Sequence, residues 1–256
     1  MRKIIAIAVG KGGVGKTTTA INLSACLAAT EKKTLLIDFD PSGSCSGFLN
    51  VQNVNIESGI FKVFSFAKSI MQVVIKTELQ FLDFVPSDIS NPDIEERLIR
   101  LTNSGNLFKN ILNSSELLVY DYIIIDCPPT LRGLTTIALT AANTVLIPIK
   151  AGDFSILALK KMFEYYLWIK SHCNAELKIE GILRTMYETD TKAWSMTNEE
   201  LAKSYSSYVL ETVIPKNTTL TEAEFFHKPA ILYNLKSRGA QAYLSLTEEI
   251  LLNNIH

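Results

Sequence analysis

The stretch Gly10-Lys11-Gly12-Gly13-Val14-Gly15-Lys16-Thr17 lies between an apolar run at residues 4–9 and a helical pattern at residues 18–28. A buried strand, a glycine loop and a helix form the setting in which the pattern G-x-x-x-x-G-K-[ST] binds phosphate. Glycines let backbone N–H groups turn towards an anion, and the N-terminus of the helix adds partial positive charge. The stretch therefore predicts a nucleotide site.

Individual residues of this loop have expected tasks. The ammonium of Lys16 should reach the outer phosphates, and the hydroxyl of Thr17 should bind Mg²⁺. Lys11 is a second lysine inside the loop that the pattern does not require. A glycine turn without a ligand is the alternative, and the flanking strand and helix count against it. The residues that we expect to contact the nucleotide are Gly10, Lys11, Gly12, Gly13, Val14, Gly15, Lys16, Thr17 and Thr18.

The length and composition suit a protein with one large core. The chain has 256 residues, of which 47% are hydrophobic and 20% charged, and its formal net charge is −1. We therefore expect a single domain over residues 1–256. A nearly neutral chain gives no global sign of binding to nucleic acid or to an anionic membrane.

The cysteines and the apolar runs indicate the compartment. The four cysteines are far apart and include no C-x-x-C pair, which favours reduced thiols and argues against a metal cluster. The basic and apolar N-terminus has the composition of a signal peptide, but it leads directly into the glycine loop, so we interpret it as a strand. No apolar run in the sequence is long enough to span a bilayer. We expect a cytoplasmic protein.

Two acidic segments follow apolar runs. Asp38 and Asp40 end the strand expected at residues 33–38, at the edge of an α/β sheet where ligands bind. Alternation would place both carboxylates on one side, whereas an Asp-Pro turn without function is the alternative. Asp126 ends the strand-forming run 120–126 and should hold the hydration shell of Mg²⁺ opposite the loop. We interpret the thiol of Cys127 as a packing group, because no histidine partner is in view.

Strands and helices alternate along the rest of the chain. We expect helices at residues 60–75, 93–101, 107–112, 134–142, 155–170, 198–205 and 237–252, and strands at 79–85, 144–149, 179–184 and 208–214. This alternation predicts an α/β fold with a doubly wound, mostly parallel sheet, helices on both faces and the nucleotide at the carboxyl edge of the strands. The last helix has two glutamates and no basic residue between 241 and 252, so we expect it to pack on the sheet rather than bind a membrane.

Three motifs together resemble one family. Residues 11–20 (KGGVGKTTTA) are similar to the deviant Walker A box of the ParA/MinD P-loop NTPases, and residues 38–41 (DFDP) resemble their second acidic box. Residues 121–129 (DYIIIDCPP) resemble the Walker B region of the ParA/Soj branch. Further similar segments lie at residues 181–186, 212–217 and 236–244. The resemblance covers nearly the whole chain.

The resemblance implies an ATPase that dimerises when ATP is bound and hydrolyses ATP slowly with Mg²⁺. Lys11 would reach across the dimer to the partner's phosphates, with a role comparable to that of an arginine finger. Lys16 would hold the phosphates of its own subunit, and Thr17, Asp126 and Asp40 would bind Mg²⁺. The cofactors implied are ATP, ADP and Mg²⁺.

Other site residues also follow from the resemblance. Asp40 would orient the attacking water, and Asp38 would support the surrounding shell. Gly12 lies where the two subunits would meet, so a side chain there should block dimerisation. Met186 and Pro215 lie in segments that resemble the backbone contacts of the adenine pocket.

The family also implies partners. In ParA-type proteins the ATP-bound homodimer binds DNA nonspecifically, and a ParB-type partner stimulates hydrolysis, so that plasmids or chromosome origins are partitioned. Such a protein would be nucleoid-associated and would not bind a membrane. The chain begins at its first strand, so we expect no N-terminal helix-turn-helix extension and no sequence-specific operator binding.

The sequence departs from the family at three positions. Ser42 stands where the acidic box usually has glutamine, which changes the loop but keeps both carboxylates. Asp190 and Thr219 align with two arginines that contact DNA phosphates in the Soj branch, and an aspartate reverses the sign of such a contact. The remaining candidates for DNA contacts are Lys192, Lys203, Lys216, Lys228, Lys236 and Arg238.

Three alternatives to DNA partitioning therefore stay open. The chain could be a ParA-like ATPase that positions a cargo other than DNA. It could be a MinD-type switch on a membrane surface, which the acidic last helix disfavours. It could also be a metabolic or redox P-loop enzyme, although no cysteine pair for a cluster is present in the sequence.

Overall fold

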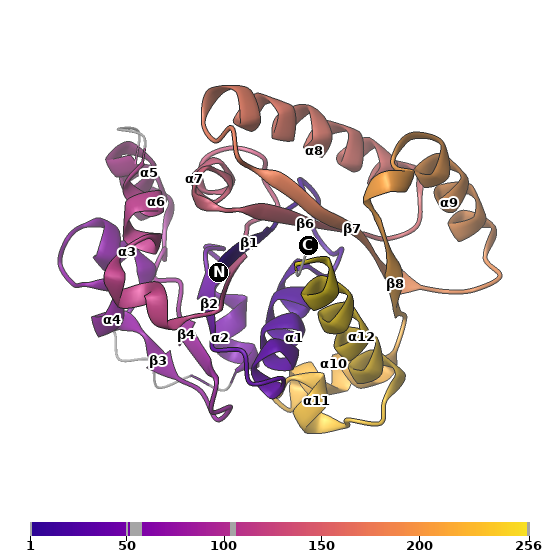
Figure 1. The fold of residues 1–256 in the computed structure, drawn as a ribbon, viewed down its shortest axis with the longest axis horizontal. Helices are drawn as coiled ribbons and strands as arrows, with labels where there is room; N and C mark the ends of the chain where they lie inside the picture. The colour runs from indigo at the N-terminus through magenta and orange to yellow at the C-terminus, as the bar shows by residue number, and fades with distance from the viewer. Residues whose placement is uncertain (1, 50, 52–57, 103–105, 255–256) are drawn as a thin grey trace.

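A computed structural model describes residues 2–49, 51, 58–102 and 106–254. Within these residues, eight strands form one sheet in the order β3-β4-β2-β5-β1-β6-β7-β8 (Figure 1). The strands are β1 (Lys3–Ile7), β2 (Thr34–Asp38), β3 (Ile75–Lys76), β4 (Leu82–Val85), β5 (Tyr122–Asp126), β6 (Thr144–Ile149), β7 (Lys178–Tyr187) and β8 (Val209–Pro215). Only the pair β3–β4 is antiparallel among these strands, so the predicted α/β fold with a mostly parallel sheet is confirmed.

Helices cover both faces of the sheet (Figure 1). The α-helices are α1 (Lys16–Ala29), α2 (Ser44–Phe48), α3 (Ile60–Phe64), α4 (Ile70–Val73), α5 (Pro92–Thr102), α6 (Leu107–Leu112), α7 (Leu134–Ala141), α8 (Asp153–His172), α9 (Lys192–Ser204), α10 (Thr218–Phe225), α11 (Ala230–Tyr233) and α12 (Arg238–Asn253). Two 3₁₀ turns are η1 (Ser115–Val119) and η2 (Ser206–Tyr208). Each face has its own apolar cluster, formed with helices α3 to α9 on one side and with α1, α2, α11 and α12 on the other.

The central strand β1 shows why the sequence forms a covered sheet. Ile4 and Ala6 belong to one apolar cluster, while Ile5 and Ile7 belong to the other. Successive side chains of a strand point to opposite faces, so an uninterrupted apolar run requires helices on both faces. β5 and β6 flank β1 in parallel, which gathers the carboxyl ends of these strands at one edge.

The last helix packs as predicted. Tyr243, Leu246 and Ile250 on α12 are buried in the cluster that contains α1. The carboxylate of Glu249 accepts hydrogen bonds from the backbone N–H groups of Glu211 (2.7 Å) and Thr212 (3.0 Å), which protects edge strand β8. None of the helices in the described ranges combines the length and the apolar character that crossing a bilayer requires.

The single helix predicted at residues 60–75 is wrong. The segment contains the short helices α3 and α4 and then β3, which pairs with β4. Phe66 adopts a left-handed backbone conformation with φ 58°, and this conformation ends α3. Ser69 and Gln72 then form a capping box that starts α4.

Two other boundaries depend on capping residues outside the apolar pattern. α9 begins at Lys192 rather than near residue 198, because the Thr191 hydroxyl accepts a hydrogen bond from the N–H of Trp194 at 3.3 Å. α10 was not expected at all, and its N-cap Asn217 accepts a hydrogen bond from the N–H of Thr219 at 2.9 Å. Residues 103–105, between the helices expected at 93–101 and 107–112, lie outside the described residues.

Candidate functional site

The glycine loop joins β1 to α1 at the carboxyl edge of the sheet. Gly13 (φ 65°) and Gly15 (φ 83°) adopt left-handed conformations that L-amino acids with side chains rarely take. Gly12 and Gly13 are exposed, and a Cβ atom added to either would meet nothing within 4 Å. The loop is therefore uncovered at Gly12 and Gly13, and its left-handed glycines give the backbone the turn that a phosphate-binding loop requires.

Lys16 starts α1 and is buried at the base of the loop. Its ammonium donates a hydrogen bond to the carbonyl oxygen of Lys11 at 3.0 Å. Burial lowers the pKa of Lys16, while the nearby carboxylates of Asp126 and Asp40 act in the opposite direction. A phosphate group could replace the carbonyl as the partner of this ammonium.

Strand register brings two of the predicted acids together. Asp38 on β2 pairs with Asp126 on β5, and Asp126 pairs with Ile7 on β1. The Thr17 hydroxyl donates a hydrogen bond to Asp126 Oδ2 at 2.7 Å, so the loop and the strand end are already in contact. Parallel strands that end in register therefore place Thr17, Asp38 and Asp126 at one point of the edge.

Asp126 has the surroundings of a cation ligand. Its side chain is fully buried, and among the described residues its Oδ1 atom has no hydrogen-bond partner. Burial raises the pKa of Asp126 to about 7, and the negative charge of Asp40 adds to the shift. Burial also raises the pKa of Asp38, and the charge of Asp126 contributes next. A buried carboxylate with a free oxygen beside a second acid fits a hard divalent cation such as Mg²⁺.

Cys45 is a neighbour that the sequence did not indicate. Its N–H donates a hydrogen bond to Asp38 Oδ2 at 3.0 Å, and its thiol donates to Asp126 Oδ2 at 3.5 Å. Burial raises the pKa of this thiol well above its usual value, so it stays protonated. Cys45 therefore acts as a hydrogen-bond donor to the two acids, while oxygen atoms are left to bind a hard cation.

Asp38 and Asp40 differ in their surroundings. Asp38 is fully buried, and its Oδ1 accepts a hydrogen bond from the N–H of Asp40 at 3.1 Å. Asp40 lies beyond the end of β2, is partly exposed, and accepts a hydrogen bond from the N–H of Ser42 at 2.9 Å. Asp40 thus forms a turn, as the sequence alternative suggested, while its charge also acts on Lys16 and Asp126. Its carboxylate is the one that water can reach.

The segments expected at the adenine pocket lie at the ends of adjacent strands. Tyr187 on β7 pairs with Pro215 on β8, and Met186 is half-exposed with φ 51°. The carbonyl oxygen of Met186 accepts a hydrogen bond from the indole N–H of Trp194 at 3.4 Å. Met186 and Pro215 are therefore close to each other at the same edge of the sheet as the loop.

Thr185 ties this second region to the glycine loop; it lies in the family-like segment 181–186, but the sequence pattern assigns this residue no role. Its buried hydroxyl lies 2.9 Å from the carbonyl oxygen of Val14 and 3.0 Å from that of Ile149, and its single proton is shared between these two acceptors. Val14 is in the loop and Ile149 ends β6. One hydroxyl on β7 therefore fixes the position of the loop relative to two strands.

We expect Thr185→Val to weaken nucleotide binding about tenfold and to lower the free energy of unfolding by about 1–2 kcal/mol, because two buried carbonyl groups lose their donor. Thr185→Ser keeps the hydroxyl and is the matched control. Fluorescent-nucleotide titration and urea unfolding measure the two effects. Equal nucleotide affinity in Thr185→Val and the parent would show that the loop does not depend on this tie.

The candidate DNA contacts are mostly separate surface cations. Lys203 forms an ion pair with Glu200 (2.9 Å), and Lys216 forms one with Glu188 (3.1 Å). The other candidates are exposed side chains at Lys192, Lys228, Lys236 and Arg238. Asp190 is exposed in the turn before α9, and Thr219 lies in the first turn of α10.

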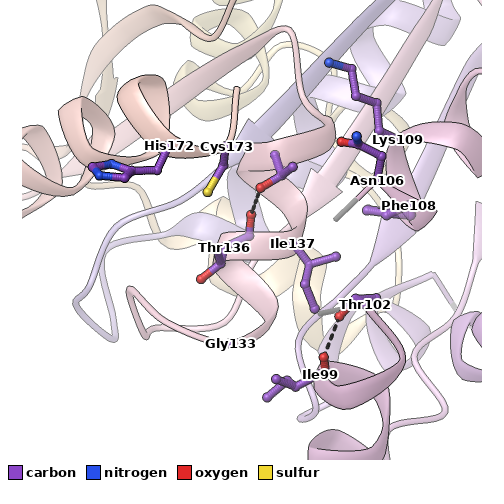
Figure 2. Close-up of a pocket in the computed structure, with 11 residues that line it drawn as sticks. Ile99, Thr102, Asn106, Phe108, Lys109, Gly133, Thr136, Ile137, His172 and Cys173 are labelled. Carbon is purple, nitrogen blue, oxygen red and sulfur yellow. Dashed lines mark hydrogen bonds between the residues drawn. The ribbon is translucent and has the colours of Figure 1, made fainter. Parts of the chain in front are cut away.

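A hollow of about 400 Å³ lies between α5, α6, α7 and the end of α8 (Figure 2). His172 and Cys173 lie on one side of α7, and Asn106 and Lys109 lie on the other (Figure 2). The hollow is lined by Ile99, Thr102, Asn106, Phe108, Lys109, Gly133, Thr136, Ile137, Thr140, His172 and Cys173. None of the expected nucleotide residues lines it, so it is distinct from the loop site.

The sheet, the glycine loop and the acids at the strand ends define an α/β P-loop ATPase. A protein-family model described as an AAA domain matches residues 2–179. The chain is 38% identical to sporulation initiation inhibitor protein Soj of Bacillus subtilis, over 99% of this chain and all of the relative. It is 39% identical to chromosome partitioning protein ParA of Myxococcus xanthus, over 97% of this chain and 88% of the relative.

A solved structure agrees with these relatives. The septum site-determining protein MinD of Pyrococcus horikoshii, complexed with Mg-ADP, superposes with a TM-score of 0.78 at 26% identity and covers 100% of this chain and 98% of its own. The chain belongs to the ParA/Soj-type partition ATPases of the ParA/MinD P-loop family. The predicted resemblance is confirmed.

Proposed function

We propose that the protein is a switch ATPase that dimerises when it binds ATP, hydrolyses ATP slowly to ADP and phosphate with Mg²⁺, and partitions plasmid or chromosomal DNA with a ParB-type partner. The observation that carries the proposal is the 2.7 Å hydrogen bond from the Thr17 hydroxyl to Asp126 Oδ2, next to buried Asp38. The other carboxylate oxygen of Asp126, Oδ1, has no partner among the described residues. This arrangement suits a divalent cation and a triphosphate at the glycine loop.

The residues of the site have distinct proposed roles. Lys16 neutralises the phosphates, and Thr17 and Asp126, with Asp40, hold Mg²⁺. A cation held there would supply positive charge against the phosphate oxygens. Asp40 orients the attacking water from its exposed position, whereas buried Asp38 fixes the backbone of that turn through the N–H of Asp40. Such positioning accounts for most of the catalysis in phosphoryl transfer.

The rest of the nucleotide is bound by backbone groups in this proposal. The N–H groups of the glycine loop and of Thr18 face the phosphates, at the positive end of the 14-residue helix α1. The adenine lies near the backbone of Met186 and Pro215, which share an edge of the sheet with the loop. That residues 1–256 form a single ATPase domain stays a prediction.

Lys11 is the residue that points to a dimer. Its carbonyl oxygen is occupied by the ammonium of Lys16, and its own ammonium lies 5.6 Å from the ring centroid of Phe154. The ammonium therefore lies against the first turn of α8 and not against a carboxylate of its own subunit among the described residues. We propose that it reaches the phosphates bound by the partner subunit, as the family resemblance implies.

A second candidate function is the positioning of a cargo other than DNA. The negative charge of Asp190 and the ion pairs of Lys203 and Lys216 favour it, because nonspecific DNA binding depends on free cations facing phosphates. A membrane-surface switch is disfavoured, because the apolar face of α12 is buried against the protein. Localisation in the cytoplasm, at the nucleoid if DNA is bound, belongs to the leading proposal.

A salt titration of binding to random DNA tests these alternatives. We expect binding to require ATP and Mg²⁺ and to weaken steeply between about 50 and 200 mM salt. ADP and the dimerisation variant Gly12→Val are the controls. Absence of binding at low salt would reject the DNA-partition function, and the cargo proposal would take its place.

We expect Asp190→Arg to strengthen this ATP-dependent binding and to steepen the plot of log K against log salt by about one unit per subunit, because a repulsive charge becomes a phosphate contact. Asp190→Asn is the matched control, since asparagine tolerates the left-handed backbone at φ 66° without adding a cation. An unchanged slope in Asp190→Arg would place the DNA surface elsewhere.

A further inference from the structure

Lys11 and Phe154 lie in segments that follow neighbouring strands, and their side chains contact each other. Lys11 follows β1, and Phe154 is the second residue of α8, which follows β6. β1 and β6 are parallel neighbours, with Ile7 opposite Leu146. The Lys11 ammonium lies over the Phe154 ring at 5.6 Å from its centroid, which is within the range of a cation–π interaction.

The Phe154 ring is the favourable electrostatic contact that the described residues offer to the Lys11 ammonium. Among the described residues, no carboxylate forms an ion pair with Lys11. Burial lowers the pKa of Lys11, and the positive charge of Lys150 adds to that effect. An ammonium beside a second cation and without a carboxylate gains from the electron-rich face of an aromatic ring.

The backbone that carries Phe154 is held in place. Gly152 has φ 117°, a conformation that favours glycine, and its N–H donates a hydrogen bond to the Thr197 hydroxyl at 3.1 Å. The N–H of buried Ser155 donates to the carbonyl oxygen of Gly152 at 2.9 Å. Phe154 is nevertheless 77% exposed and lies outside both apolar clusters of the described residues. Core packing therefore does not explain a large aromatic side chain at this position.

We propose that Phe154 is a positioning residue that holds the Lys11 ammonium on its own subunit until the partner's phosphates replace the ring. The inference rests on the proposed role of Lys11 across the dimer. While the ring holds the Lys11 ammonium, it competes with dimerisation. An exposed cation–π contact of this kind changes an equilibrium by about two- to fivefold, and each subunit contributes once.

Two substitutions of Phe154 test whether its aromatic face, and not merely its apolar side chain, binds the Lys11 ammonium. Phe154→Leu keeps an exposed apolar side chain but removes the π face, so the dimer formed with ATP and Mg²⁺ should become tighter by about two- to fivefold per subunit. Phe154→Trp offers a better cation–π partner and should weaken the dimer. Leu157→Ala, which changes an exposed residue on the next turn of α8, is the control that should match the parent. Sedimentation equilibrium at several ATP concentrations measures these constants.

The contact itself is tested in the nucleotide-free protein. Lysines carrying ¹³C-methyl groups are observed by NMR, and the Lys11 signal is assigned from the spectrum of Lys11→Arg. We expect a ring-current shift to high field that Phe154→Leu removes and Leu157→Ala keeps. Absence of that shift in the parent would overturn the proposal, and so would a weaker dimer in Phe154→Leu, which would make Phe154 an interface contact. Unchanged dimerisation of Lys11→Ala, with the shift present, would instead refute the role of Lys11 across the dimer.

Discussion

Asp126→Asn is expected to stabilise the nucleotide-free protein and to abolish its response to Mg²⁺. Asp126 and Asp38 are fully buried and adjacent, and one oxygen of Asp126 has no partner among the described residues. Removing the charge relieves desolvation and repulsion, while the amide oxygen can still accept the hydrogen bond of Thr17. We expect an increase in the free energy of unfolding on the order of 2–4 kcal/mol at pH 8.

The sign of the pH dependence follows from the raised pKa. The pKa of Asp126 is about 7 in the folded protein, above the usual value of about 4 in an unfolded chain. The folded state therefore binds more protons between these values, and the parent loses stability as the pH rises through this window. The advantage of Asp126→Asn should be small near pH 4 and largest above pH 7. Thermal unfolding across this range measures it.

The matched control is a buried carboxylate that does have partners. Asp83 Oδ2 accepts hydrogen bonds from the Tyr120 hydroxyl (2.6 Å) and the Lys76 ammonium (2.7 Å). Asp83→Asn removes an ion pair instead of a repulsion, so it should destabilise the protein by about 1–2 kcal/mol. Mg-ATP should raise the melting temperature of the parent and of Asp83→Asn but not of Asp126→Asn. A Mg²⁺ response retained by Asp126→Asn would exclude Asp126 as the cation ligand.

Gly12→Val and Lys11→Ala should both strongly weaken dimerisation with ATP while leaving the monomer folded. Gly12 is exposed, and a Cβ atom there meets nothing within 4 Å, so valine fits the monomer and interferes only with a partner. Lys11→Ala removes the cation proposed to reach the partner's phosphates. We expect the dimer to weaken and the hydrolysis rate to fall by at least about 100-fold, because a charge supplied in trans contributes most of the acceleration in related switches.

Gly10→Val is the control for a substitution that disturbs the loop within one subunit. A Cβ atom at Gly10 would lie 2.8 Å from Leu131 Cγ, so valine there disturbs the loop within one subunit and should impair nucleotide binding itself. Gly12→Val and Lys11→Ala should instead bind fluorescent nucleotide nearly as well as the parent. Light scattering with ATP and Mg²⁺ measures the dimer. If Gly12→Val and Lys11→Ala dimerised normally, the two-subunit site would have to be abandoned.

In the nucleotide-free protein, Thr17 and Asp126 are already in place at the edge of the sheet, where two buried acids lie side by side. Thr17 and Asp126 are already hydrogen-bonded, so little rearrangement is needed for them to hold a cation. The two buried acids make the nucleotide-free state unfavourable, and the pKa of both carboxyl groups is raised, chiefly by burial. A cation would relieve both effects at once. Binding of Mg-ATP would therefore stabilise the strand ends as well as occupy the loop.

The features of this protein that depend on local pattern could be predicted from its residues alone. The glycine loop, the apolar strands and the acids at their ends predicted the α/β sheet and placed Thr17, Asp38 and Asp126 at one edge. This works because parallel strands gather their carboxyl ends, so position along each strand is enough. The family followed from the same residues.

Features that depend on contacts between distant segments became visible in the folded chain. The fold separated buried Asp38 from accessible Asp40, brought the Thr185 hydroxyl to the loop, and placed Phe154 beneath Lys11. It also ended α3 through the left-handed backbone of Phe66. Periodicity reports which face of an element is apolar, but burial of a charge and the partner of a side chain depend on the register of strands far apart in the chain.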